Sequence, residues 1–149
     1  MPILVLLIIT LCTPAIAVGQ TVCFAADFAT SEANCPDDAV SPCVIEGDYL
    51  LAEGCTLDFG TREVTLGRNA ALRLGEDILT IKAGTLVLAG GLIDATGIDS
   101  GGTVSLEVVG DVRLVLDRIL PRGRIDASGM LLGGTVAIQA GGNVEVLDA

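Results

Sequence analysis

Asp94 and Asp126 are the residues whose type and spacing first suggest chemistry. They occupy the same place in two nearly identical words, I-D-A-T-G and I-D-A-S-G. If the words form neighbouring parallel strands, the carboxylates lie about 4.8 Å apart and repel by roughly 1 kcal/mol in water, or about 3 kcal/mol at a dielectric of 20. We therefore expect exposed carboxylates, bonds from turn amides, or a shared cation such as Ca²⁺. Because each Asp alternates with inward apolar residues, an outward turn or surface position is preferred and Ca²⁺ is the weaker interpretation.

Catalytic side chains are otherwise scarce. The chain has no His, which excludes a Ser/His/Asp triad, a Cys/His dyad and an imidazole metal site. A lyase-like site needs carboxylates for a cation and a basic proton acceptor on neighbouring coils. The nearest such group joins Arg124 to Asp94 and Asp126. We expect no catalytic residue and no cofactor apart from the weak calcium candidate.

Charge and aromatic content limit the partners. Eight basic and 19 acidic residues give a net charge of −11, which argues against nucleic acid because phosphate contact needs clustered Lys and Arg. The four aromatic residues all precede residue 61, so a sugar groove on the later repeats is poorly supplied; they are Phe24, Phe28, Tyr49 and Phe59. The partner stays open, with an extracellular glycan or cell-surface component as one candidate.

The chain has five cysteines, of which Cys12 lies in the segment 1–17 that is expected to be removed, and the remaining four are Cys23, Cys35, Cys43 and Cys55. An even number in an exported chain predicts two disulfides. Three pairings are open, and Cys23–Cys35 with Cys43–Cys55 is attractive because the two gaps are equal. The alternative is a zinc site of four thiolates, which is disfavoured because no two cysteines have the short spacing of zinc modules.

Residues 1–17 resemble a secretory signal peptide. An apolar stretch over 3–11 precedes Pro14, and the small residues of 15–17 suit cleavage after Ala17. A basic residue near the start is missing. The alternative is an uncleaved membrane anchor, but the apolar stretch is shorter than the roughly 20 residues of a spanning helix. We expect bacterial-type export, and a secreted or cell-surface location.

The remaining chain divides near residue 60. Residues 18–60 lack a regular period and are expected to form an irregular, disulfide-bonded cap. Residues 61–149 alternate apolar and polar side chains in short runs separated by Gly pairs, as in strands with one buried face. Helical periodicity is absent there, so this part is predicted to be all-β. Glu76 and Asp77 between two such runs are expected to form a solvated turn.

An internal repeat indicates the architecture. Residues 93–116 recur in 125–148 with ten identities at a constant offset of 32. A β-sandwich gives no reason for such recurrence, whereas a solenoid stacks units that bury little alone. The residues that define the repeat are Ile93, Asp94, Ala95, Gly97, Gly101 and Gly102, which return as Ile125, Asp126, Ala127, Gly129, Gly133 and Gly134.

The repeated words I-D-A-[ST]-G, G-G-T-V-x-[LI] and G-x-V resemble the coils of secreted bacterial right-handed parallel β-helix proteins. This group includes filamentous-haemagglutinin-like and autotransporter-like adhesins and the pectate-lyase-like superfamily. The resemblance implies a right-handed parallel β-helix over about 60–149. It carries no particular activity, because such coils serve adhesins, stalks, lyases and hydrolases alike.

These observations predict a non-enzymatic structural or adhesive segment of a longer β-helix protein. Strand alternation still runs at 144–147 and no polar cap follows, although solenoids need capped ends. Further coils of the same protein are therefore expected partners. The alternatives are the opening part of a pectin-lyase-like enzyme whose catalytic coils lie elsewhere, and an exported domain that dimerises through its open end.

Overall fold

A computed structural model describes residues 21–28, 35, 42–116 and 123–148. This part is all β except for the short 3-10 helix η1 (Ala25–Phe28). The strands are β1 (Thr21–Val22), β2 (Cys43–Ile45), β3 (Asp48–Leu51), β4 (Cys55–Asp58), β5 (Glu63–Leu66), β6 (Ala71–Arg73), β7 (Ile78–Ala83), β8 (Thr85–Leu88), β9 (Leu92–Asp94), β10 (Thr103–Val108), β11 (Val112–Leu116), β12 (Arg124–Asp126), β13 (Thr135–Ala140) and β14 (Val144–Asp148).

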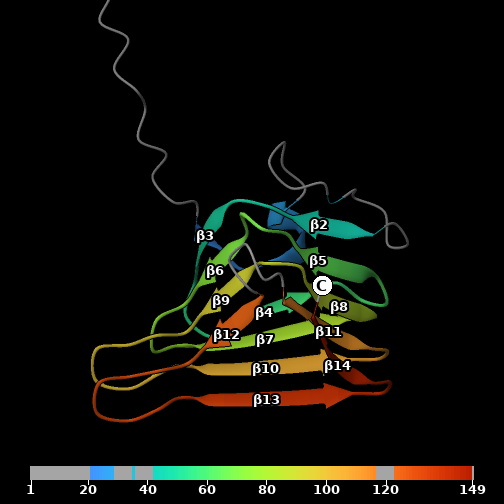
Figure 1. Cartoon of the computed structure of the whole chain (residues 1–149). Helices are drawn as coiled ribbons and strands as arrows, with labels where there is room; N and C mark the ends of the chain where they lie inside the picture. The colour runs from blue at the N-terminus through green and yellow to red at the C-terminus, as the bar shows by residue number, and fades with distance from the viewer. Residues whose placement is uncertain (1–20, 29–34, 36–41, 117–122, 149) are drawn as a thin grey trace, which may run out of the picture.

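The strands form three sheets in which every pair is parallel. Sheet A has the order β1-β3-β6-β9-β12, sheet B the order β2-β5-β8-β11-β14, and sheet C the order β4-β7-β10-β13. The chain visits sheets B, A and C in turn, then returns to B one layer further on (Figure 1). One strand from each sheet makes a coil, so the predicted solenoid-like stack is confirmed.

The repeated words lie one layer apart, as predicted. Asp94 of β9 is in register with Asp126 of β12, and Ile93 with Ile125. The corner loops stack as well, through a parallel bridge from Gly97 to Gly129. The loops that follow β9 and β12 run close to each other in Figure 1.

Coil length is not constant along the stack. In sheet B, Cys43 pairs with Val64, and Val64 with Leu86. Leu86 then pairs with Val112, and Val112 with Val144, so each step is longer than the one before it. The extra residues enter at corners, and the constant offset of the sequence repeat therefore describes only the last step.

Alternating side chains fill the interior. In β7, Leu79, Ile81 and Ala83 are buried while the residues between them face outward. Their register partners in β10 are Val104, Leu106 and Val108, which are also buried. Aliphatic columns therefore run along the stack, and each coil covers the inward side chains of its neighbour.

The stack begins earlier than the sequence pattern indicates. β2, β3 and β4 lie in the segment 18–60 expected as an irregular cap, yet they pair in parallel with β5, β6 and β7. Aromatic residues fill this first coil. The ring of Phe28, from η1, meets Tyr49 at 4.9 Å and Phe59 at 5.9 Å between centroids.

The disulfide pairing preferred from equal gaps is wrong. Cys35 is bonded to Cys43, whereas Cys23 and Cys55 are free thiols. This bond also removes the four-thiolate zinc alternative. The equal gaps are a poor guide because the fold, and not the loop length, decides which cysteines are adjacent. Cys43 is the first residue of β2 and Cys55 the first residue of β4, and these strands belong to different sheets.

Glycine permits close approach at the corners. A side chain at Gly102 would overlap the backbone carbonyl oxygens of Gly75 and Asp77 in the preceding coil. Gly60 serves differently, since its φ of +63° is the left-handed region that favours glycine in the turn after β4.

The proposed signal peptide, residues 1–17, lies outside the described residues. In the described part of the chain, no helix is long and apolar enough to cross a membrane.

Candidate functional site

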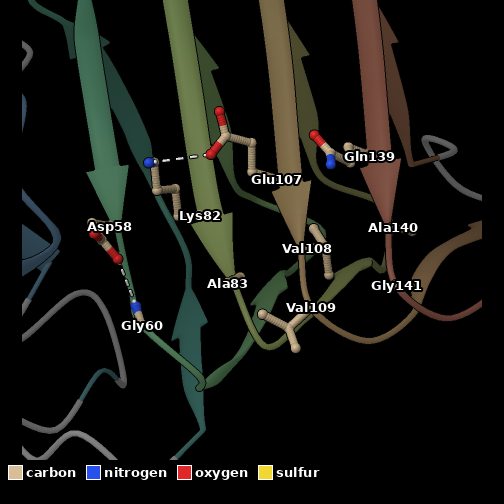
Figure 2. A pocket seen from close by; sticks show the side chains of 10 residues that line it. All are labelled: Asp58, Gly60, Lys82, Ala83, Glu107, Val108, Val109, Gln139, Ala140 and Gly141. Carbon is tan, nitrogen blue, oxygen red and sulfur yellow. Dashed lines mark hydrogen bonds and ion pairs between the residues drawn. The ribbon is translucent and has the colours of Figure 1, made fainter.

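A shallow groove of about 530 Å³ lies where sheet C turns towards sheet B. We call it the sheet C groove. Figure 2 shows its walls, which come from the carboxyl ends of four consecutive strands in four coils. The lining residues are Asp58, Gly60, Lys82, Ala83, Glu107, Val108, Val109, Gln139, Ala140 and Gly141.

Strand register aligns the polar residues of the groove. Asp58 pairs with Lys82, Lys82 with Glu107, and Glu107 with Gln139. The four are one strand spacing apart, about 4.8 Å, and alternate with the inward residues of their strands. The row therefore reads acid, amine, acid, amide along the stack axis.

Lys82 is paired with Glu107, while Asp58 adds a second negative charge, so the row of four carries a net charge of −1. Lys82 Nζ lies 3.2 Å from Glu107 Oε2, and both side chains are nearly half exposed. Asp58 Oδ1 accepts a hydrogen bond from the Gly60 amide at 2.9 Å (Figure 2). This net negative charge does not favour an anionic ligand. The exposed groups of the row can donate and accept hydrogen bonds along the stack axis.

Asp94 and Asp126 have partners other than a metal. Asp94 accepts bonds from the Thr96 amide and hydroxyl, and its other oxygen lies 2.8 Å from Arg73 Nη1. Asp126 accepts equivalent bonds from Ser128 and faces Arg124 Nη2 at 3.4 Å. Of the alternatives weighed for this pair, the described contacts match turn amides, and arginine provides the positive charge.

Arg73 connects three coils on the outer face of sheet A. Its Nε lies 2.8 Å from Asp48 Oδ1 and its Nη1 2.8 Å from Asp94 Oδ2. Burial raises the pKa of Asp94, but the Thr96 bonds and the Arg73 charge outweigh it, so the pKa lies below the ordinary value. Asp94 and Asp126, the carboxylates nearest to a lyase-like group, therefore pair with two different arginines, Arg73 and Arg124.

A second set of carboxylates accepts backbone hydrogen bonds at the corners between sheets. Glu46 accepts from the Asn69 amide, Glu76 from the Asp99 amide at 2.8 Å, and Asp111 from the Asn143 amide. Each bond joins one coil to the next. Hydrogen bonds from the backbone of 99 and 100 lower the pKa of Glu76.

The turn expected at Glu76 is therefore also a link between coils. The sequence alone does not predict this link, because two of the three carboxylate–amide pairs are 23 residues apart and the third is 32 residues apart, and no repeated word marks them. Only the folded corners bring each carboxylate to an amide of the next coil.

The described residues offer no ready metal or stacking site. No group of three or more His, Cys, Asp or Glu side chains among them is arranged to hold a metal ion. Phe28, Tyr49 and Phe59 are buried in the first coil, so they supply packing rather than a sugar platform. Phe24 is exposed but lies outside the sheet C groove.

The sheet C groove is not predicted from the sequence. The sequence feature that corresponds to it is one polar residue near the end of each sheet C strand. These residues are spaced unequally along the chain, so no sequence period identifies the row. Compared with known proteins, the chain matches no protein-family model, no curated protein and no solved structure.

Proposed function

We propose that this chain is a non-enzymatic structural segment of a secreted or cell-surface β-helix protein. Its role is to carry further coils of the same polypeptide, stacked in parallel on β12, β13 and β14. The observation that carries the proposal is the contrast between equivalent inward residues in the last two coils.

That contrast is plain along two columns. Leu106 is completely buried, whereas its register partner Ile138 is 39 % exposed. Val112 is completely buried, whereas its partner Val144 is 53 % exposed. Among the described residues, the last coil presents an apolar face together with the unpaired edges of β12, β13 and β14. Such a face is a template for another strand layer.

A parallel coil is the occupant that fits best. Backbone donors and acceptors at these edges are spaced for parallel strands, because every existing pair in the three sheets is parallel. We infer right-handed coiling, since crossovers between parallel strands of one sheet are right-handed in nearly all proteins. This handedness accords with the resemblance to secreted bacterial β-helices.

Export is supported by two features. The apolar start with Ala15 and Ala17 suits a cleaved signal, and a Cys35–Cys43 disulfide suits an oxidising compartment. Mass analysis of the exported protein tests this part. We expect a chain that begins at Val18, and retention of Met1 in a cytoplasmic pool would contradict it.

The open face is tested by self-association. At micromolar concentration the chain should associate and bind the dye ANS, because its terminal apolar face is uncovered. Ile138→Lys with Val144→Lys should abolish both effects. Ile78→Lys is the matched control, since Ile78 is exposed on the side of a covered coil. A monomer without dye binding would contradict an adhesive stacking face.

The identity of the occupant has a separate test. Messenger RNA sequenced beyond the Ala149 codon should encode more Gly-punctuated coils, each about as long as one step of this stack. A stop codon directly after Ala149 would leave a second copy of the chain as the covering partner and would overturn the proposal of further coils.

The sheet C groove favours a second role, adhesion to an extracellular glycan. Its row of hydrogen-bonding groups runs across four coils, which suits an extended neutral polymer. Lys82→Met with Glu107→Gln should weaken glycan-array binding at least tenfold, whereas Glu63→Gln on sheet B should not. Cleavage of a uronic-acid polymer by this chain that is lost with Lys82→Met would contradict the non-enzymatic proposal.

A further inference from the structure

Cys23 and Cys55 meet at the start of the stack. β1 pairs with β3 through Val22 and Leu51, which brings the residue after Val22 over the first coil. The Val22 carbonyl accepts a hydrogen bond from the Ala52 amide at 3.2 Å and from Cys55 Sγ at 3.7 Å. The Val22 carbonyl carbon is bonded to the Cys23 nitrogen, so Cys55 Sγ lies beside the backbone of Cys23, and interaction with the Cys23 side chain contributes to the raised pKa of Cys55.

The backbone around Cys23 is held in place. Asp27 Oδ2 accepts hydrogen bonds from the amides of Cys23 and Phe24, both at 2.9 Å, and Phe28 at the end of η1 is completely buried. Cys55 is also buried, in β4. Both residues are therefore held in place, with Cys55 Sγ next to the carbonyl group that directly precedes Cys23.

We propose that Cys23 and Cys55 form a second disulfide, nested around Cys35–Cys43. With Cys35 and Cys43 bonded to each other, each remaining thiol has the other as its neighbour. The inference rests on the proposed export for its setting in the cell, while the geometry itself does not depend on it.

The reaction is a thiol–disulfide exchange with a small disulfide oxidant such as oxidised glutathione. Cys23 is only half-buried, so its thiolate attacks the oxidant and forms a mixed disulfide, releasing one glutathione thiol. The Cys55 sulfur, after losing its proton to water, attacks Cys23 Sγ and releases the second. Burial and the interaction with the Cys23 side chain raise the pKa of the Cys55 thiol to about 12, so this second step is expected to be the slower one.

Peptide mapping tests the pairing directly. Trypsin is unsuitable, since no Lys or Arg precedes Arg62, but a protease that cleaves after Asp and Glu separates all four cysteines at sites that include Glu32, Asp37 and Glu46. After equilibration of the purified chain with oxidised glutathione, free thiols are alkylated and the protein is digested without reductant. We expect one peptide pair joining Cys23 to Cys55 and one joining Cys35 to Cys43.

Thiol counting provides the matched controls. The oxidised chain, with any Cys12 thiol subtracted, should show no free thiol, and Cys23→Ser or Cys55→Ser should each show one. Loss of the bond should lower Tm by roughly 10 °C, because it closes a loop of about 30 residues. Alkylation of both Cys23 and Cys55, or any other pairing, would overturn the proposal. If the bond forms in vitro but the protein isolated from cells keeps both thiols reduced, the pairing stands and the proposed export fails.

Discussion

The two ends of the described stack differ in how far the inward apolar side chains of their outermost coils are covered. At the amino-terminal end, Phe28 packs on Tyr49 and Phe59, and β1 covers an edge of sheet A. At the other end of the described stack, the inward residues of β13 and β14 face solvent, and Val146 is 63 % exposed. Aromatic rings cover the first end of the described stack, whereas aliphatic side chains at the second end are exposed.

This difference shows that a coil in such a stack derives its burial from its neighbours. β10 and β13 share the same alternation and register, yet within the described residues β10 has a coil on both sides and β13 on one. The same alternation of apolar residues therefore contributes more to the free energy of unfolding in β10 than in β13.

Truncating Phe28, which packs on Tyr49 and Phe59 in the first coil, should have the largest effect on stability. Phe28→Ala should lower the free energy of unfolding by about 3–5 kcal/mol, because a completely buried ring leaves a cavity. Urea denaturation measures it. Phe24→Ala, at an exposed position of the same segment, should change stability by less than about 0.5 kcal/mol. Equal losses for both variants would show that the rings do not close this end.

A matched pair of truncations sharpens the comparison between covered and open coils. Leu106→Ala should cost about 2–5 kcal/mol, whereas Ile138→Ala, its register partner, should cost less than about 1 kcal/mol. Urea midpoints of the two variants, measured at a protein concentration too low for self-association and with the slopes held equal, test the ratio. Similar losses would mean that the last coil is covered in solution.

Close packing at the corners gives an intermediate effect. Gly102→Ala should destabilise the chain by about 1–3 kcal/mol, because the new methyl group meets the carbonyls of Gly75 and Asp77. Gly133→Ala should be nearly neutral, since the space around Gly133 is open. Thermal unfolding of the two variants distinguishes them, and a neutral Gly102→Ala would refute tight stacking of the corner loops.

The smallest effect concerns pH. The folded-state pKa of Asp94 is lowered, so its stabilising contribution is complete above the unfolded value of about 3.9 and is lost as pH falls through the folded pKa. Thr96→Val removes a hydroxyl donor at 2.6 Å and should move that pKa upward in an NMR titration. An unchanged titration would show that the hydroxyl does not hold the carboxylate.

Much of the fold follows from short-range pattern. Alternation marks strands such as β10 and β13, and the repeated words place Asp94 beside Asp126. The first coil is not predicted, because β2 to β4 are short and their corners repeat no word of the later coils.

The candidate site is harder to foresee. Arg73 reaches Asp94 across 21 residues and Asp48 across 25, and the steps between Asp58, Lys82 and Glu107 also differ. Such partners are set by corner lengths, which the hydrophobic pattern does not encode. The Cys35–Cys43 bond escapes prediction for the same reason.

The unequal coils have a consequence for how this protein can change. Residues 95–102 and 127–134 lengthen the corner between sheets A and C, while the strands on either side keep their register. Added residues at this corner leave the buried aliphatic columns unchanged, because surface connections tolerate added residues better than packed strands do. The exposed positions of this corner, such as Ile98 and its repeat counterpart Met130, are accordingly the places where additional peptide can be inserted for display.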